Sequence, residues 1–245
     1  MLRLEHLYFS VQNNGESKQI LTDINLEIEK GKLYGITGPN GGGKTTLAKV
    51  IMGILPHTSG HLYLDGEDIS GKNITERANL GIAYAFQQPS RFKGLTVEDL
   101  IKIAQPKLGN LSVRKKMRDV GLCPEDYLDR DMSSGLSGGE MKRIEIVQVL
   151  ARNAKVAIFD EPEAGVDLWT IQRLVDIIVG KYQKNPNAAS LIITHNRNIL
   201  PICDNIVVVE DGKIKHQGLQ EDIWPLIRDD IICQVQDTCR GEEII

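Results

Sequence analysis

A glycine-rich stretch holds the strongest chemical signal in this sequence: Gly38-Pro39-Asn40-Gly41-Gly42-Gly43-Lys44-Thr45-Thr46. It fits the pattern of Gly, four residues and Gly-Lys-Ser/Thr, whose backbone N–H groups turn inward around a polyphosphate. The stretch lies between a predicted strand at 32–37 and a predicted helix at 45–52, and a helix start adds unpaired N–H donors and a positive dipole end. We expect Lys44 to bridge the outer two phosphates and the Thr45 hydroxyl to bind Mg²⁺. The sequence therefore predicts a nucleoside triphosphate site.

Two adjacent carboxylates follow a short apolar run at 156–159. A buried strand there would bring Asp160 and Glu161 to the edge of the sheet at which the phosphate loop opens. Asp160 is expected to hold Mg²⁺, usually through water, because this ion keeps several waters and takes few protein ligands. Glu161 is expected to orient and deprotonate the attacking water. Acidic pairs at strand ends are common on solvated surfaces, but together with a phosphate loop they favour the catalytic interpretation.

A second glycine-containing segment, Leu136-Ser137-Gly138-Gly139-Glu140, begins a predicted helix at 137–150. Ser137 with Glu140 three residues later matches a capping box. Capping alone does not explain Gly138 and Gly139, because glycine weakens a helix start. Glycines at a helix start also allow a phosphate to approach bare backbone N–H groups. Both interpretations can hold together.

The hydrophobic patterning predicts an α/β fold. Residues 2–11 and 20–29 alternate between apolar and polar side chains, which indicates two antiparallel strands. The later strands are continuously apolar and alternate with helices, as expected of a parallel sheet covered on both faces. Two short strands at 206–209 and 213–216 flank Asp211-Gly212, which predicts a hairpin.

Helical periodicity replaces the strands in the middle of the chain, at 97–104 and 113–120. We interpret this region as a small helical subdomain inserted into the larger domain. The predicted organisation is a nucleotide-binding core at 1–87 and 135–220, the helical subdomain at 88–134, and a partly helical C-terminal tail at 221–245.

Composition narrows the classes of protein to consider. The 245 residues are 41% hydrophobic and 25% charged, which is enough to bury a core, and the formal net charge is −4. This charge leaves no electrostatic footprint for a nucleic-acid backbone. Charged residues interrupt every apolar segment, and the N-terminus lacks a signal-peptide pattern. We therefore expect a cytoplasmic protein without nucleic-acid binding and without direct membrane insertion.

The four cysteines, Cys123, Cys203, Cys233 and Cys239, form no Cys-x-x-Cys pair. The spacing between Cys233 and Cys239 is not a usual metal-ligand spacing. We interpret all four as structural or incidental thiols, kept reduced in an intracellular setting.

The motifs together resemble those of a known family. They occur in a fixed order: the phosphate loop, Gln87 after a strand, Leu136-Ser137-Gly138-Gly139-Glu140, Asp160-Glu161, Gly165-Val166-Asp167, and His195 after a strand. This order resembles the ATPase domain of the ATP-binding-cassette (ABC) superfamily over residues 2 to about 218. The resemblance implies a phosphate-loop NTPase fold with an antiparallel β subdomain and an inserted helical subdomain, an ATPase activity, and ATP and Mg²⁺ as ligands.

The resemblance also implies roles for matching residues. Gln87 would contact Mg²⁺ and sense a partner through the helical subdomain, and His195 would hold the γ-phosphate and the attacking water. Family members work as ATP-dependent head-to-tail homodimers. In such a dimer, Ser137-Gly138-Gly139 would contact ATP held by the other copy, and Asp167 would lie across the interface.

One departure concerns the adenine ring, which many family members stack on an aromatic residue near the end of the first strand. Val11 stands at that place in this sequence. Tyr8 or Phe9 could substitute for it.

The segment after Gly139 is similar to SufC, the ATPase of the Suf iron–sulfur cluster assembly system. That family has Gly-Gly-Glu, Lys-Arg and an acidic residue two places on, matching Glu140, Lys142-Arg143 and Glu145. Against this, Asp160-Glu161-Pro162 is the form found in transporters, and residues 94–98 resemble metal-importer ATPases.

Two partners follow from these alternatives. A SufC-like ATPase would deform a scaffold of SufB or SufD type bound at the helical subdomain. A nucleotide-binding subunit of an ABC membrane transporter would use the same subdomain to move the coupling helix of a membrane permease. A chromosome-maintenance ATPase is disfavoured, because no long coiled coil interrupts the chain between Lys44 and Ser137.

Overall fold

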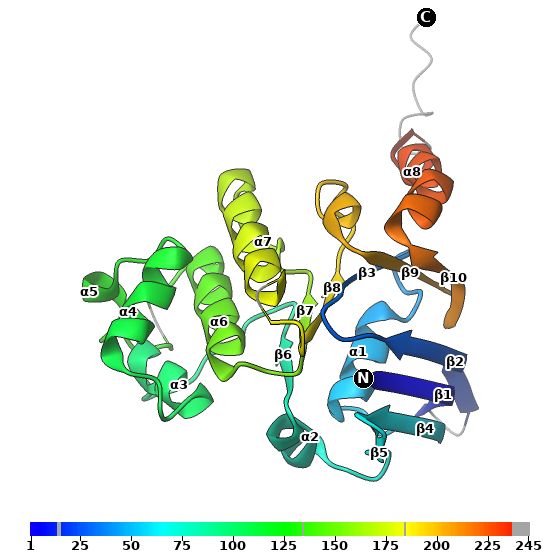
Figure 1. The fold of residues 1–245 in the computed structure, drawn as a ribbon, viewed down its shortest axis with the longest axis horizontal. Coiled ribbons are helices and arrows are strands. Elements are labelled where there is room, and N and C mark those ends of the chain that lie inside the picture. The colour runs from blue at the N-terminus through cyan, green and yellow to red at the C-terminus, as the bar shows by residue number, and fades with distance from the viewer. Residues whose placement is uncertain (14–15, 134, 184, 237–245) are drawn as a thin grey trace, which may run out of the picture.

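Two β-sheets, with one helix between them, form the centre of the fold (Figure 1). The computed structural model describes residues 1–13, 16–133, 135–183 and 185–236. The helix between the sheets, α1 (Lys44–Met52), buries Leu47 and Ile51 in a cluster that includes side chains of both sheets. The phosphate loop therefore leads into a helix that is packed in this apolar cluster between the sheets.

The larger sheet has six strands in the order β10-β9-β3-β8-β7-β6. All neighbouring strands are parallel except β10, which pairs antiparallel with β9. The strands are β3 (Leu33–Thr37), β6 (Ile82–Ala85), β7 (Val156–Asp160), β8 (Ala189–Ile193), β9 (Asn205–Glu210) and β10 (Lys213–Leu219). Every residue of β3, β6, β7 and β8 is buried, which confirms the predicted parallel sheet with both faces covered.

The smaller sheet is antiparallel, in the order β2-β1-β4-β5. Its strands are β1 (Leu2–Asn13), β2 (Glu16–Ile28), β4 (Ser59–Leu64) and β5 (Glu67–Asp68). The predicted pair at 2–11 and 20–29 is confirmed, but β1 and β2 extend further towards their turn. Register shifts in this pair accompany positive φ angles at His6 (46°) and Asp23 (52°), which mark bulges that bend the strands.

A group of helices lies on the side of the larger sheet away from the antiparallel sheet (Figure 1). It contains α3 (Val97–Ala104), α4 (Asn110–Asp119), α5 (Pro124–Tyr127), α6 (Gly138–Arg152) and α7 (Leu168–Gln183). The first three pack on α6 through one apolar cluster that includes Ile101, Met117 and Ile144. Helix α3 matches its prediction, whereas α4 begins at Asn110, three residues before the expected start.

Two helices complete the described chain, together with the short turn η1 (Leu200–Ile202). Helix α2 (Ile74–Leu80) begins with a capping box between Asn73 and Glu76, a signal that was not used in the prediction. Helix α8 (Gln220–Gln236) packs Ile223 and Ile227 against β9. No helix in the described ranges has the length and apolar character needed to cross a membrane. Of the tail cysteines, Cys233 lies in α8 and Cys239 lies outside the described residues.

Candidate active site

The phosphate loop connects β3 to α1 and is pressed against the end of β9. A Cβ atom on Gly38, whose φ is 132°, would lie 2.0 Å from the carbonyl oxygen of Val209, and one on Gly42 would lie 2.7 Å from the same oxygen. Only glycine fits such a close backbone approach. The loop therefore owes its path to its glycines, and it leads directly into the first N–H groups of α1.

The Lys44 ammonium lies inside this loop. Its Nζ donates hydrogen bonds to the carbonyl oxygens of Gly38 and Pro39, both at 2.8 Å. Burial lowers the pKa of Lys44, and the charges of Glu161 and Asp160 oppose this effect. A cation is thus held within electrostatic reach of both carboxylates.

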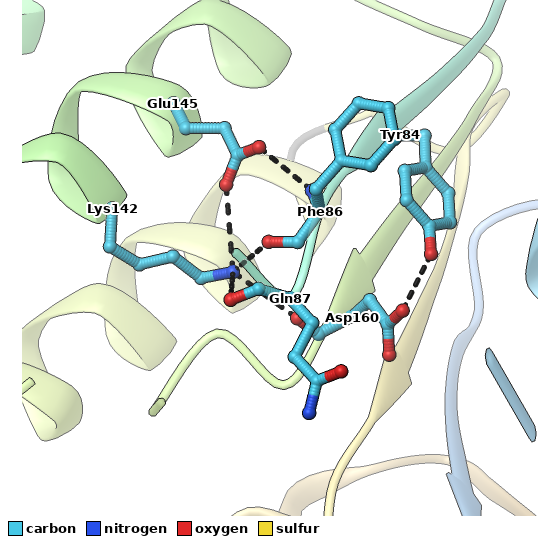
Figure 2. A network of polar contacts seen from close by, with 6 residues as sticks. All are labelled: Tyr84, Phe86, Gln87, Lys142, Glu145 and Asp160. Atoms are coloured by element: carbon cyan, nitrogen blue, oxygen red, sulfur yellow. Dashed lines mark hydrogen bonds and ion pairs between the residues drawn. The ribbon is translucent and has the colours of Figure 1, made fainter. Parts of the chain in front are cut away.

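Asp160 ends β7 and is completely buried. Its Oδ1 accepts a hydrogen bond from the Thr45 hydroxyl at 3.1 Å. Figure 2 shows the second bond, in which its Oδ2 accepts from the Tyr84 hydroxyl at 2.5 Å. Thr45 and Asp160 are therefore in contact. One lies at the start of α1 and the other at the end of β7, and both were expected to hold Mg²⁺. Tyr84 was not predicted. The sequence signal that could have identified it is a tyrosine within the apolar run before Gln87.

Replacing Tyr84 with Phe should destabilise the protein by about 1.5–3 kcal/mol, because the hydrogen bond joins the hydroxyl to a carboxyl group in a buried site. It should also raise the Mg²⁺ concentration that gives half-maximal ATP turnover, since Asp160 would lose one of the bonds that orient it. Chemical denaturation and a Mg²⁺ titration of turnover measure the two effects.

Tyr34→Phe is the matched control. The Tyr34 side chain is also buried, and its hydroxyl accepts a hydrogen bond from the Glu29 N–H at 3.1 Å. This control should lose stability without any change in Mg²⁺ dependence. If Tyr84→Phe leaves the Mg²⁺ dependence of turnover unchanged, Tyr84 does not orient Asp160 for Mg²⁺ binding.

Glu161 follows β7 directly and has an unusual backbone. Its φ is 45°, a left-handed conformation that costs a non-glycine residue about 1–3 kcal/mol. The conformation is held by hydrogen bonds from the Glu161 N–H to Ile193 O and from the Ala164 N–H to Glu161 O, both at 3.0 Å. The Glu161 carboxylate accepts a hydrogen bond from Gln87 Nε2 at 2.7 Å. Gln87 and Glu161, predicted separately, are therefore in direct contact.

These residues surround one hollow of about 230 Å³. It is lined by Asn40, Gly41, Gly43, Lys44, Thr45, Thr46, Gln87 and Glu161. Residues of the glycine-rich loop, a lysine and the candidate base thus line the same space.

His195 lies two residues beyond β8, on the same edge of the sheet. Desolvation lowers the pKa of its imidazole, the Lys44 charge lowers it further, and Glu161 opposes both. The imidazole is therefore mainly neutral at pH 7 and able to donate or accept a hydrogen bond. Glu163 is an unpredicted neighbour: it accepts a hydrogen bond from the Thr194 hydroxyl, and burial raises the pKa of its carboxyl.

The predicted capping box at the start of α6 is present. Glu140 N–H donates to Ser137 Oγ at 3.3 Å, and Ser137 N–H donates to the Glu140 carboxylate at 2.7 Å. Among the described residues, leaving out its chain neighbours and the backbone of α6, a Cβ on Gly138 would meet no atom within 4 Å, and one on Gly139 would lie 3.2 Å from Gly165 O. Packing within this chain therefore does not require glycine at position 138.

Two predicted groups do not join the hollow within this chain. Ser137-Gly138-Gly139 and Asp167 are absent from the described residues that line it. Asp167 instead accepts hydrogen bonds from the N–H and the hydroxyl of Thr170 in the first turn of α7.

One adenine-stacking candidate is wrong. Phe9 is only 6% exposed and belongs to the apolar cluster between the sheets, because it points to the inner face of β1. Its neighbour Tyr8 is partly exposed, and Val11 is 38% exposed. Tyr8 remains the candidate.

Comparison with known proteins identifies the family. The model of the family described as "ABC transporter" matches residues 21–164. An uncharacterised ABC transporter ATP-binding protein of Methanocaldococcus jannaschii is 34% identical, over 89% of this chain and 88% of its own. The lipopolysaccharide export system ATP-binding protein LptB of Haemophilus influenzae is 33% identical, over 85% and 88%. A dimeric post-hydrolysis state of an ATP-binding cassette bound to ADP and Pi has a TM-score of 0.79 at 22% identity, over 90% and 99%.

These relatives are described as ATP-binding proteins of transporters, which favours the transporter alternative and does not support the SufC-like assignment. The matched motifs, the ABC ATPase fold and the family model all agree. This chain belongs to the ABC transporter family and is an ATP-binding ATPase of that family.

Proposed function

We propose that this chain is the cytoplasmic nucleotide-binding subunit of a membrane transporter. In this proposal it binds MgATP in the hollow around Lys44 and hydrolyses it with Glu161 as general base. The observation that carries the catalytic part is the convergence of Lys44, Thr45, Gln87 and Glu161 on one space, with Asp160 bound to Thr45.

The donor set suits Mg²⁺. Thr45 offers a hydroxyl, Asp160 a carboxylate, and Gln87 an amide oxygen, and Mg²⁺ prefers oxygen ligands while keeping several of its waters. Gln87 donates to Glu161 through its nitrogen, so its oxygen is the atom that can serve as a ligand. When bound, the ion would neutralise charge on the phosphate oxygens.

The chain's own groups divide the remaining work. Lys44 and the loop N–H groups would bind the phosphates and stabilise the charge that develops on them. Glu161 would accept a proton at its carboxylate, and Gln87 would fix the position of that carboxylate. His195, mainly neutral at pH 7, would orient the attacking water by hydrogen bonding.

A second copy would complete the site. Ser137-Gly138-Gly139 and Asp167 lie outside their own chain's hollow, and the space beside Gly138 is open within this chain. These observations support contact with ATP held by another copy, in an ATP-dependent homodimer. A structural relative of the same fold is described as dimeric in a post-hydrolysis state.

A groove between the parallel sheet and the helical region supports docking of a partner. It has a volume of about 190 Å³, and its lining includes Phe86, Phe92, Met132 and Met141. Phe86 is 36% exposed and Phe92 is 42% exposed. An apolar groove of this kind suits the apolar face of an amphipathic helix. In this proposal, the helix belongs to a cytoplasmic loop of the permease.

The SufC-like role remains a second candidate because the segment after Gly139 is similar to SufC, and two residues of that segment are in contact. Lys142 and Glu145, part of the pattern that resembles SufC, form an ion pair at 3.5 Å in the interior of the protein. A scaffold of SufB or SufD type would then occupy the same groove.

Affinity purification of the tagged full chain in detergent separates the two candidates. Recovery of a polytopic membrane protein in a fixed ratio is the expected result. Recovery of a soluble SufB- or SufD-like scaffold would overturn the transporter proposal in favour of the second candidate.

Phe92→Asp should weaken the association with the partner at least tenfold, because a charge would be buried in an apolar contact. Turnover of the isolated chain should stay at the parental level. Leu111→Asp, which changes an 85% exposed residue of α4 outside the groove, is the control and should bind the partner normally. Equal binding by both variants would exclude the groove as the docking site. Binding is measured with the purified partner by titration.

A further inference from the structure

Lys142 is a fully buried lysine on α6, and its ammonium contacts three different parts of the chain (Figure 2). It donates to the carbonyl oxygens of Phe86, of Gln87 at 3.4 Å and of Asp160 at 3.2 Å. It also pairs with the Glu145 carboxylate at 3.5 Å, one turn along the same helix. The side chain therefore joins α6, the segment that carries Gln87 and the end of β7.

Glu145 holds the same segment from the other side. Its Oε1 accepts a hydrogen bond from the Phe86 N–H at 2.8 Å. Strand β6 ends at Ala85, so Phe86 is the first residue without a partner strand. Glu145 and Lys142 bind its N–H and its carbonyl oxygen in place of a strand. The backbone just before Gln87 is thus fixed by two side chains of α6.

Stability alone does not account for this arrangement. A buried ion pair is costly to desolvate, and apolar side chains of similar volume often stabilise a protein as well or better. Burial lowers the pKa of Lys142 and raises the pKa of Glu145, and each charge partly offsets the shift of the other. The contacts of the pair instead lead to residues of the active site.

We infer that Lys142 and Glu145 are positioning residues for ATP hydrolysis, which hold the Gln87 segment against the carboxyl end of β7. They lie on the helix that begins with Ser137-Gly138-Gly139. A shift of α6 on contact with a second copy is therefore transmitted to Gln87 and Asp160 of the same chain. This inference rests on the roles proposed above for Gln87 and Asp160.

The test uses two double variants of the full chain that remove both charges together. Lys142→Met with Glu145→Leu removes the hydrogen bonds that the two side chains make to the backbone of Phe86 and Gln87. Lys142→Met with Glu145→Gln keeps an acceptor for the Phe86 N–H and is closer in shape to the parent. Turnover should fall about 10- to 100-fold in the first, as expected for a misplaced catalytic group, and by an intermediate factor in the second. The affinity for ATP measured without Mg²⁺ should stay within about threefold in both, because the phosphate loop is untouched.

Arg77→Met is the matched control for loss of a buried cation. Arg77 is 2% exposed and donates to the carbonyl oxygens of Val50 at 2.7 Å and Ile51 at 2.9 Å, at the end of α1. Its replacement should lower the melting temperature and leave turnover at the parental level.

Parental turnover in either folded double variant would overturn the inference, and so would a parallel loss of turnover and of the affinity for ATP measured without Mg²⁺. If the variant with Glu145→Leu does not fold, the variant with Glu145→Gln tests the inference by the same measurements. Failure of the proposed ATPase site is distinguishable from failure of this inference. If the site were wrong, the parent chain itself would show no Mg²⁺-dependent turnover.

Discussion

Glu161→Gln is expected to lower ATP turnover by about 10²–10⁴-fold, the range that general base catalysis contributes. The amide has nearly the same shape as the carboxylate and can still accept the hydrogen bond from Gln87, but it cannot take a proton from water. Binding of MgATP should persist, because Lys44, Thr45 and the loop N–H groups are unchanged. A dimer should then accumulate in the presence of MgATP. Phosphate release, equilibrium binding of MgATP and size-exclusion chromatography measure the three outcomes.

Glu163→Gln is the matched control for Glu161→Gln. It neutralises a carboxylate two residues away that accepts a hydrogen bond from Thr194, a bond that the amide oxygen can also accept. Its turnover should stay close to that of the parent. If Glu161→Gln hydrolyses ATP at the parental rate, Glu161 is not the base, and the assignment would move to another group of the hollow.

Gly138→Ala is expected to lower turnover by about 100-fold, because displacing a phosphate by about 1 Å costs that much. Apart from the chain neighbours and the backbone of α6 itself, no described residue lies within 4 Å of the added methyl group, so folding should not suffer. Alanine in place of glycine in a helix should even stabilise the protein, by up to about 1 kcal/mol. The loss would arise only when a second copy brings its ATP to the start of α6. Phosphate release measures turnover, and chemical denaturation measures stability. Contact with the second copy is measured by combining Gly138→Ala with Glu161→Gln and following the MgATP-induced dimer.

Gly180→Ala provides the comparison. Gly180 lies inside α7, and apart from its chain neighbours and the backbone of α7 no described residue has an atom within 4 Å of an added Cβ. This variant should gain similar stability and keep both turnover and the dimer. A Gly138→Ala protein that dimerises and hydrolyses ATP normally would contradict the assignment of Ser137-Gly138-Gly139 to the ATP of the second copy.

Local sequence signals predicted most of the fold. The continuous apolar runs became the buried parallel strands, and Asp211-Gly212 became the turn between β9 and β10. Helix α3 agreed with its predicted range because Thr96 and Asp99 cap it and its apolar residues recur at helical spacing. Helix α2 was overlooked although Asn73 and Glu76 form its capping box, since its short span has only a weak apolar period.

The active site was predicted in its parts but not in its connections. Lys44, Thr45, Asp160 and Glu161 were named from local motifs along the chain, and Gln87 was named from the resemblance to the ABC superfamily. Tyr84 was missed because its importance depends on Asp160, which is distant in sequence. Phe9 was proposed for adenine, but the direction of its side chain depends on the register of β1, which no local pattern showed.

The sequence by itself determined the chemistry: a glycine loop for phosphates, a lysine and a threonine at a helix start, and two carboxylates after an apolar strand. These features depend on neighbouring residues, so they can be read along the chain. Tertiary structure decided which groups meet. Parallel pairing of β6 with β7 brings Tyr84 to Asp160 and Gln87 to Glu161, and packing of α6 beneath them brings in Lys142. Strand order and helix packing create these contacts between residues distant in sequence, so only the folded chain reveals them.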